Sequence, residues 1–212
     1  MSGGNESEPA CGNAGTDPLV SPFMKIAVIG AGRIGGTVGG KWEAAEHEVS
    51  YGLRDPSKKT RAKTIDQALK GAEVVLLAVP GAALTQVVRD HAKGLDGKVV
   101  IDATNNFGGE SMNAWSKVAS AVPRAHLYRA FNSLGWDVFA NPVLDGQQAD
   151  LFYAGPEGDP KAAVEQLISD AGLRPVWVGG PDQADTIDGV LRLWYTLSRT
   201  RGRRIAFKLI SD

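Results

Sequence analysis

Short apolar runs alternate with longer stretches of helical periodicity from Lys25 to about Gly179. The runs are rich in valine, isoleucine and leucine, which is typical of strands buried on both faces of a sheet. Seven strands are predicted, at residues 25–29, 48–53, 74–79, 98–102, 126–130, 150–153 and 174–178. Because helices are expected between most of them, the pattern predicts an α/β fold of the Rossmann type, with a doubly wound, mainly parallel sheet.

The clearest helix is predicted over residues 160–171. Asp159 is expected to cap its N-terminus, Pro160 suits the first turn, and Gly172 can end it. Its apolar residues share one helical face, and they are Val164, Leu167, Ile168 and Ala171.

The alternation stops after Gly179, Gly180 and Pro181. Apolar residues then recur at helical spacing only, at Ile187, Val190, Leu191, Trp194 and Leu197. The arginines of residues 199–204 follow, and they suit a solvated helix face or subunit contact better than a substrate anion. Three segments are therefore predicted: a disordered tail at 1–23, a Rossmann domain at 24–180 and a helical appendage at 181–212.

The composition narrows the class of protein. The tail holds three acidic residues and no basic ones, so the rest has 23 basic and 21 acidic residues. This balance gives no field that attracts nucleic acid or an anionic membrane, and no apolar run is long enough to span a bilayer. Cys11 is the single cysteine, which excludes an internal disulfide. A cytoplasmic protein is expected.

The first predicted strand runs directly into a G-x-G-x-x-G motif, in which Ala31, Arg33 and Ile34 fill the variable positions. Gly30 permits a tight turn, Gly32 lets the backbone approach a pyrophosphate, and Gly35 lets the following helix pack on the strand. The N-terminus of that helix offers free N–H groups to the phosphates. The motif in this context predicts a dinucleotide site rather than a ligand-free glycine turn.

The end of the second strand distinguishes NAD from NADP. An NAD site has a carboxylate there, whereas this chain has Arg54, with Lys58 four residues later. Arg54 can bind a 2′-phosphate through its guanidinium fork and stack on adenine, and Lys58 adds a second cation. NADP(H) is therefore predicted. The alternative is that Asp55 binds the ribose and Arg54 points into solvent.

The later strands end in residues that suit the nicotinamide end of such a site. Ala78, Val79 and Pro80 follow a buried strand and are expected beside the crevice where open α/β sheets bind ligands. Asparagines follow the next two strands, at Asn105, Asn106 and Asn132. Their amides suit a nicotinamide carboxamide or a polar substrate, although each of them could equally stabilise a turn.

No catalytic acid or base is evident in the sequence. His47, His91 and His126 are scattered, and none neighbours a carboxylate in a pattern typical of proton transfer. No metalloprotease, nucleophile-elbow or P-loop motif occurs. If the protein is an enzyme, the nicotinamide carries the chemistry and the protein positions it.

Several segments, in order, resemble the NADPH-dependent coenzyme F420 reductases, also described as the F420-dependent NADP oxidoreductase family. The segments are MKIAVIGAGRIGGTVGGKW, YGLRDPSK, VVLLAVPGAAL, KVVIDATNNF, RAFNSLGWDVFANP, DLFYAG and GRRIAFKL. The resemblance implies a Rossmann domain that binds NADP(H) and passes hydride directly to a deazaflavin stacked on the nicotinamide. Such a transfer would account for the absence of an acid/base group.

The resemblance also implies roles for individual positions. The pyrophosphate loop falls on Gly30, Gly32, Arg33, Ile34 and Gly35, and the 2′-phosphate site falls on Arg54 and Lys58. The nicotinamide side falls on Val79, Pro80 and Asn132. Leu53 departs from the family, which commonly has a serine there that also contacts the 2′-phosphate.

The predicted function is hydride transfer between NADP(H) and coenzyme F420 or a flavin-like acceptor. A reductase of a small imine, keto acid or ferric substrate is the first alternative, but such enzymes usually carry a longer helical domain after the Rossmann part. The second is a non-catalytic NADP-binding sensor. The short appendage implies an open site for a small redox substrate, or one completed by a second subunit in a homodimer. No nucleic acid, membrane or metal is expected.

Overall fold

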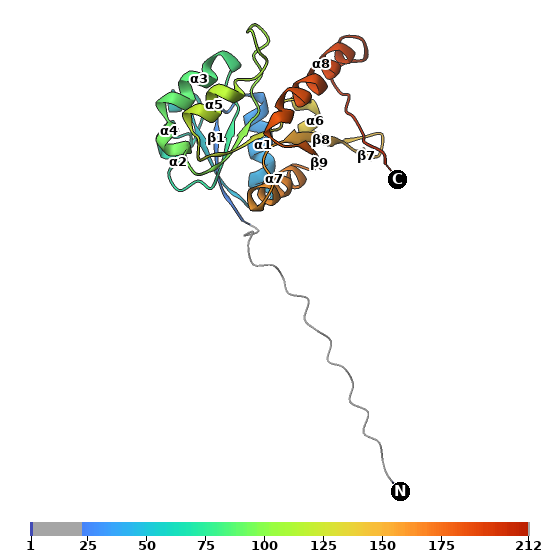
Figure 1. Cartoon of the computed structure of the whole chain (residues 1–212), viewed down its shortest axis with the longest axis horizontal. Helices are drawn as coiled ribbons and strands as arrows, with labels where there is room; N and C mark the ends of the chain where they lie inside the picture. The colour runs from blue at the N-terminus through green and yellow to red at the C-terminus, as the bar shows by residue number, and fades with distance from the viewer. Residues whose placement is uncertain (2–22, 212) are drawn as a thin grey trace.

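The computed structural model describes Met1 and residues 23–211. Cys11 and residues 2–22 of the predicted disordered tail therefore lie outside the described residues. In the described part, seven strands form one sheet in the order β2-β1-β3-β4-β5-β8-β9 (Figure 1). These strands are β1 (Lys25–Ile29), β2 (Glu48–Gly52), β3 (Val74–Leu77), β4 (Val99–Asp102), β5 (His126–Arg129), β8 (Asp150–Ala154) and β9 (Arg174–Gly179).

The sheet is mainly parallel, which confirms the predicted Rossmann-type fold. Strands β1 to β5 pair in parallel, whereas β8 meets β5 in antiparallel fashion through Arg129 and Ala154. β8 and β9 are again parallel to each other. A short hairpin, β6 (Val143–Leu144) with β7 (Gln147–Gln148), was not predicted, because two-residue strands leave no periodic signal.

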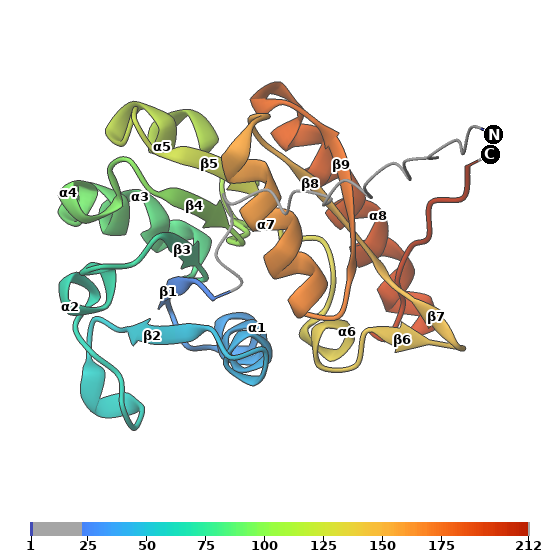
Figure 2. The same ribbon diagram turned by 90° about the horizontal axis from the view of Figure 1, so that it is seen from below.

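Helices cover both faces of the sheet (Figure 2). One apolar layer holds side chains of α1, α6, α7 and α8, and the other holds those of α2, α3, α4 and α5. The bounds are α1 (Arg33–Ala44), α2 (Ile65–Leu69), α3 (Gly81–Asp90), α4 (Ala92–Leu95), α5 (Trp115–Ala121), α6 (Trp136–Ala140), α7 (Asp159–Asp170) and α8 (Ala184–Arg201). With apolar layers on both sides, β3 is buried at every residue, and β1 and β4 beside it are buried at all but their first residue.

Several predicted boundaries need correction. The second and third strands end earlier than expected, at Gly52 and Leu77, because the chain turns away there toward Arg54 and Pro80. Asp159 is the first residue of α7 and not its cap, which is Gly158 with a φ of 98°. Gly172, with a φ of 84°, does end this helix as predicted.

The last helix and the chain that follows it pack back on β8. Trp194 of α8 donates from Nε1 to the carbonyl of Ile205 at 3.0 Å. The carboxylate of Asp150, which is fully buried, accepts from Arg174, Lys208 and the backbone N–H of Leu209. Burial alone would raise the pKa of Asp150, but these hydrogen bonds outweigh it and hold the pKa below its usual value.

We expect the substitution Asp150→Asn to lower the free energy of unfolding by about 2–3 kcal/mol at pH 7, because it removes charged hydrogen bonds. The difference from wild type should shrink as the pH falls below about 4, where the unfolded carboxyl and then the folded one take up protons. Urea unfolding at several pH values measures it. The exposed Asp145 provides a control, Asp145→Asn, and equal stability of Asp150→Asn and wild type at pH 7 would contradict the expectation.

Candidate dinucleotide site and second-substrate pocket

The glycine motif forms the turn between β1 and α1. Gly30 has a φ of +99°, and a Cβ there would lie 2.5 Å from the carbonyl oxygen of Ala78. A Cβ on Gly35 would lie 2.0 Å from the carbonyl oxygen of Gly30, so a side chain at either position would collide with backbone. Gly32 differs, because a Cβ there would meet no atom within 4 Å. The turn is therefore closely packed at Gly30 and Gly35, whereas the space around Gly32 is open.

The N-terminus of α1 faces this open space. No side chain caps the helix, and its first turn carries no acidic residue. Its first N–H groups are thus available to an anion, as a dinucleotide pyrophosphate requires. Arg33 is exposed, and its guanidinium lies 5.7 Å from the centroid of the Trp136 ring, whereas Ile34 packs against the core. The glycine turn therefore has the space and the donors that a pyrophosphate needs.

A cleft of about 400 Å³ opens beside the glycine turn. We call it the dinucleotide cleft, and its walls include Gly30, Leu53, Arg54, Ile65, Val79, Pro80, Val87 and His91. Four residues predicted for the site thus line one cleft: Gly30, Arg54, Val79 and Pro80. Ala78 lies just behind it, since its backbone carbonyl packs against Gly30.

The two other polar candidates at the end of β2 lie outside the cleft lining. Asp55 accepts from the hydroxyl of Ser57 at 2.6 Å and from the N–H of the same residue. These bonds lower the pKa of Asp55. The Lys58 side chain is 77% exposed, and its Nζ lies 3.8 Å from Asp55. The structure therefore turns Arg54 toward the cleft and Asp55 toward its own loop.

A buried charge cluster lies at the ends of β4 and β5, and it is centred on Arg129. The guanidinium is fully buried and donates to Asp188 of α8 at 2.6 Å, and it lies 3.1 Å from the carboxylate of Asp102. It also donates to the carbonyl of Thr104 and to the side chain of Asn105. Burial raises the pKa of Asp102, and Arg129 offsets this only in part. This cluster attaches α8 to the sheet.

Asn132, predicted on the nicotinamide side, belongs to this cluster. It is 2% exposed, and its Nδ2 donates to Asp188 at 3.2 Å. Its Oδ1 and the hydroxyl of Ser133 are buried without a hydrogen-bond partner in the described chain. Phe131, just before them, has a φ of 59°, an uncommon conformation for a bulky residue. Asn132 thus lies beneath the surface, and its contact with nicotinamide stays a prediction.

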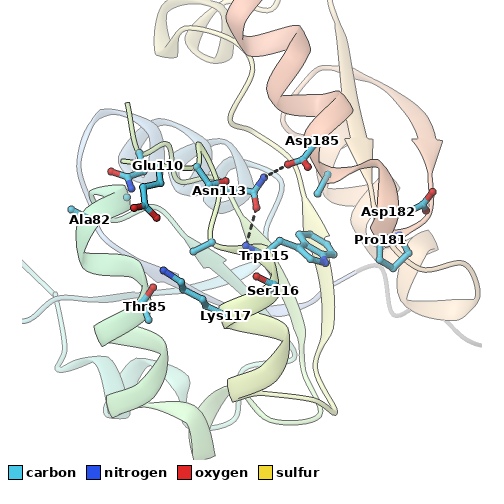
Figure 3. A pocket seen from close by; sticks show the side chains of 15 residues that line it. Ala82, Thr85, Glu110, Asn113, Trp115, Ser116, Lys117, Pro181, Asp182 and Asp185 are labelled. Atoms are coloured by element: carbon cyan, nitrogen blue, oxygen red, sulfur yellow. Dashed lines mark hydrogen bonds between the residues drawn. The ribbon is translucent and has the colours of Figure 1, made fainter. Parts of the chain in front are cut away.

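A second pocket, of about 570 Å³, lies between α3, the segment 106–117 and the start of α8 (Figure 3). We call it the α8 pocket. Its charged lining residues are Glu110, Lys117, Asp182 and Asp185, and its other walls include Gly81, Thr85, Asn106, Asn113, Trp115 and Pro181. Sequence analysis missed it, because its walls come from segments about 75 residues apart, as in the contact of Asn113 with Asp188.

Two histidines that looked isolated in the sequence have carboxylate partners in the structure. His47 is buried, with Nε2 2.8 Å from Asp170 of α7, and its Nδ1 accepts from the N–H of Met24. His91, in the wall of the dinucleotide cleft, has its Nδ1 2.6 Å from Asp66. The partners are 123 and 25 residues away along the chain, so local sequence could not reveal them. His47 thus connects the end of α7 to the residue that precedes β1.

Two further properties bear on the class of protein. Among residues 23–211, no helix combines the length and apolar character needed to cross a bilayer. The same residues contain no group of three or more histidine, cysteine, aspartate or glutamate side chains placed to bind a metal ion. The mainly parallel sheet, the tight glycine turn and the cleft beside it define a Rossmann-type dinucleotide-binding protein.

Comparison with known proteins relates the N-terminal part of this chain to a described family. Residues 25–106 match the model of the family described as NADP oxidoreductase, coenzyme F420-dependent. The match covers 82 of the 212 residues, all in the N-terminal half of the chain, and it confirms the resemblance inferred from the sequence.

Solved structures share the fold. A proposed F420-dependent NADP reductase from Arthrobacter sp. FB24 has a TM-score of 0.78 and 24% identity, over 89% of this chain and all of that one. A hypothetical protein from Sinorhizobium meliloti has a TM-score of 0.65 and 28% identity, over 75% and 86% of the two chains. A reductive aminase from Aspergillus terreus, solved with NADPH, has a TM-score of 0.62 and 17% identity, over 83% and 62%.

A curated relative matches a smaller part of the chain. The glycerol-3-phosphate dehydrogenase [NAD(P)+] of Pseudomonas savastanoi is 24% identical over 48% of this chain. The match spans 37% of that dehydrogenase, so this chain corresponds to little more than a third of its length.

Proposed function

We propose that this protein transfers hydride between NADP(H) and a second substrate bound in the α8 pocket. The observation that carries the proposal is the glycine turn, which is open at Gly32 and lies beside a cleft lined by Gly30 and Arg54. Turn and cleft together supply what a pyrophosphate and a 2′-phosphate need, and the family is one of NADP-dependent oxidoreductases.

The residues of the chain would bind and orient the nucleotide. Gly32 and the uncapped start of α1 would hold the pyrophosphate, and Arg54 would hold the 2′-phosphate as a bidentate donor. Val79 and Pro80 would then line the ribose and nicotinamide path toward the α8 pocket. NADPH, when bound, supplies the hydride, so no acid or base of the protein is needed for the transfer itself.

Asp55 supports NADP over NAD. A carboxylate that accepts from the ribose hydroxyls is the mark of an NAD site, but Oδ1 of Asp55 already accepts from Ser57, and Asp55 does not line the cleft. Arg54 pairs with no carboxylate among residues 23–211, and it lines the cleft. This arrangement favours a 2′-phosphate beside Arg54. Lys58 would act as an exposed second cation that adds attraction from a distance.

The variant Arg54→Ala is expected to weaken NADPH binding by about 1.5–3 kcal/mol and to leave NADH binding nearly unchanged, because a charged hydrogen bond contributes about that much. Fluorescence titration with each nucleotide measures the two affinities. Lys58→Ala is the matched control and should cost less, since that side chain is exposed. Equal losses for NADPH and NADH in Arg54→Ala would show that the 2′-phosphate binds elsewhere.

The comparisons support two classes of hydride acceptor. The family description names coenzyme F420, which supports a deazaflavin or flavin-like acceptor. The reductive aminase neighbour was solved with cyclohexanone and allyl amine, a ketone and an amine, which supports a small imine. The purified protein with NADPH and each acceptor in turn should lose the absorbance of the reduced nicotinamide. Tight NADPH binding without oxidation by deazaflavin, flavin, imine or ferric chelate would favour the non-catalytic sensor instead and contradict the proposal.

A further inference from the structure

The α8 pocket adjoins the nicotinamide end of the dinucleotide cleft. Pro80 lines the cleft, and the next two residues, Gly81 and Ala82, line the α8 pocket. A Cβ on Gly81 would lie 2.5 Å from the carbonyl oxygen of Asn105, so the segments that follow β3 and β4 are in contact there. A molecule in the α8 pocket would therefore lie close to a nicotinamide that follows Val79 and Pro80.

The charge of the α8 pocket is negative. Glu110, Asp182 and Asp185 line it, and among the described residues Lys117 is the single basic residue in the lining. None of the three acidic residues forms an ion pair with a lysine or arginine of residues 23–211. Asp188 behind them is different, because Arg129 neutralises it.

The carboxylate of Asp185 is held in place rather than loose. Asn113 donates from Nδ2 to Asp185 at 2.9 Å and to Asp188 at 2.6 Å, and its Oδ1 accepts from the backbone N–H of Trp115 at 2.9 Å. Figure 3 shows Asp185 and Asn113 facing each other, with the indole of Trp115 on the side of Pro181. The pocket thus combines an oriented carboxylate with an aromatic wall.

A pocket lined by carboxylates and an indole suits a small organic cation, because both kinds of group attract positive charge. An acceptor that carries phosphate or several carboxylates would meet Glu110, Asp182 and Asp185 with like charge. We infer that the α8 pocket binds a small cationic, amine-derived substrate, an iminium ion, and disfavours anionic acceptors such as coenzyme F420 and FMN. This inference rests on the proposed function and names its substrate class.

An iminium ion also needs no proton from the pocket, whose described hydroxyl groups come from Thr85, Ser111 and Ser116. The nitrogen is already protonated when the ion arrives from solution. The electrophilic carbon accepts hydride from the reduced nicotinamide, and the π-electron pair of the C=N bond moves to nitrogen. The products are NADP⁺ and an amine, which then takes up a proton from water.

The test measures binding of pyrrolidinium, the protonated product of 1-pyrroline reduction, to the full chain with NADP⁺ by calorimetry. Pyrrolidinium should bind more tightly than neutral cyclopentanone or acetate, and its affinity should fall between about 20 mM and about 200 mM salt. Asp185→Asn keeps the acceptor for Asn113 and removes the charge, so it should weaken pyrrolidinium binding about three- to tenfold. Asp145→Asn, outside the pocket, should leave it unchanged.

Tighter binding of acetate than of pyrrolidinium, or equal affinities in Asp185→Asn and Asp145→Asn, would overturn the inference. Turnover separates this failure from failure of the proposed function. Oxidation of NADPH by FMN or coenzyme F420 without pyrrolidinium binding would leave the proposed function standing and refute the substrate class. Salt-dependent pyrrolidinium binding that depends on Asp185, with no acceptor reduced, would support the cation pocket and refute hydride transfer.

Discussion

Replacing Gly32 with alanine should lower the affinity for NADPH by at least about tenfold and leave Tm close to that of wild type. Because a Cβ on Gly32 would meet no atom within 4 Å, the protein without nucleotide can accept a methyl group there. The same methyl group would occupy the place where the pyrophosphate must approach the backbone. Loss of binding without loss of stability is therefore the mark of a ligand cradle.

Two neighbouring glycines provide matched variants. Gly40→Ala, at a position of α1 where a Cβ also meets no atom within 4 Å, should keep its NADPH affinity and gain up to about 1 kcal/mol of stability. Gly35→Ala should lose about 3 kcal/mol or more, because its Cβ would press on the carbonyl of Gly30. Titration with NADPH and thermal unfolding measure both effects. Unchanged NADPH affinity in Gly32→Ala would contradict the assignment of the loop.

The variant Arg129→Met should lower the free energy of unfolding by about 3–5 kcal/mol, the usual cost of removing one partner from a buried ion pair. Without the guanidinium, the carboxylates of Asp102 and Asp188 remain buried, and the carbonyl groups of residues 102 and 104 each lose a hydrogen bond. Because Asp188 belongs to α8, we also expect that helix to detach before the rest of the sheet unfolds.

Arg203→Met is the matched control for Arg129→Met. Arg203 pairs with Asp137 at 3.2 Å but is 55% exposed, so its removal should cost less than about 1 kcal/mol. Urea unfolding gives the free energies, and hydrogen exchange of α8 reports its detachment. Equal stability of the two variants would show that the cluster around Arg129 does not hold α8.

Sequence alone predicted those parts of the site that depend on local patterns. The glycine turn, the position of Arg54 and the turn at Pro80 follow from residues adjacent to strand ends, and the structure places all three around one cleft. These residues could be assigned to one site because a parallel sheet brings the carboxyl ends of its strands to the same edge. The order of strands was not needed for that inference.

The contacts made by α8 could not be predicted in the same way. Asp188 lies on the helical face that also holds Ile187 and Leu191, and a carboxylate among buried residues was the available signal of a buried partner. That partner, Arg129, is 59 residues away, on a strand whose neighbours are known only from the fold. Asn132 follows the end of β5, but it is buried and bonded to Asp188 of the same helix, which the sequence does not reveal.

The central claim is direct hydride transfer from NADPH, and a deuterium label tests it most directly. NADPH carrying deuterium at C4 of the nicotinamide, prepared separately with each stereochemistry, is incubated with the full chain and 1-pyrroline, FMN or coenzyme F420. Mass spectrometry should find one deuterium in the pyrrolidine or deazaflavin product, from one of the two labelled forms, and NMR places it on carbon; with FMN, consumption of NADPH is the readout, because deuterium on a flavin nitrogen exchanges with water. Unconsumed NADPH with every acceptor, or a reduced deazaflavin or amine product without deuterium, would contradict the claim.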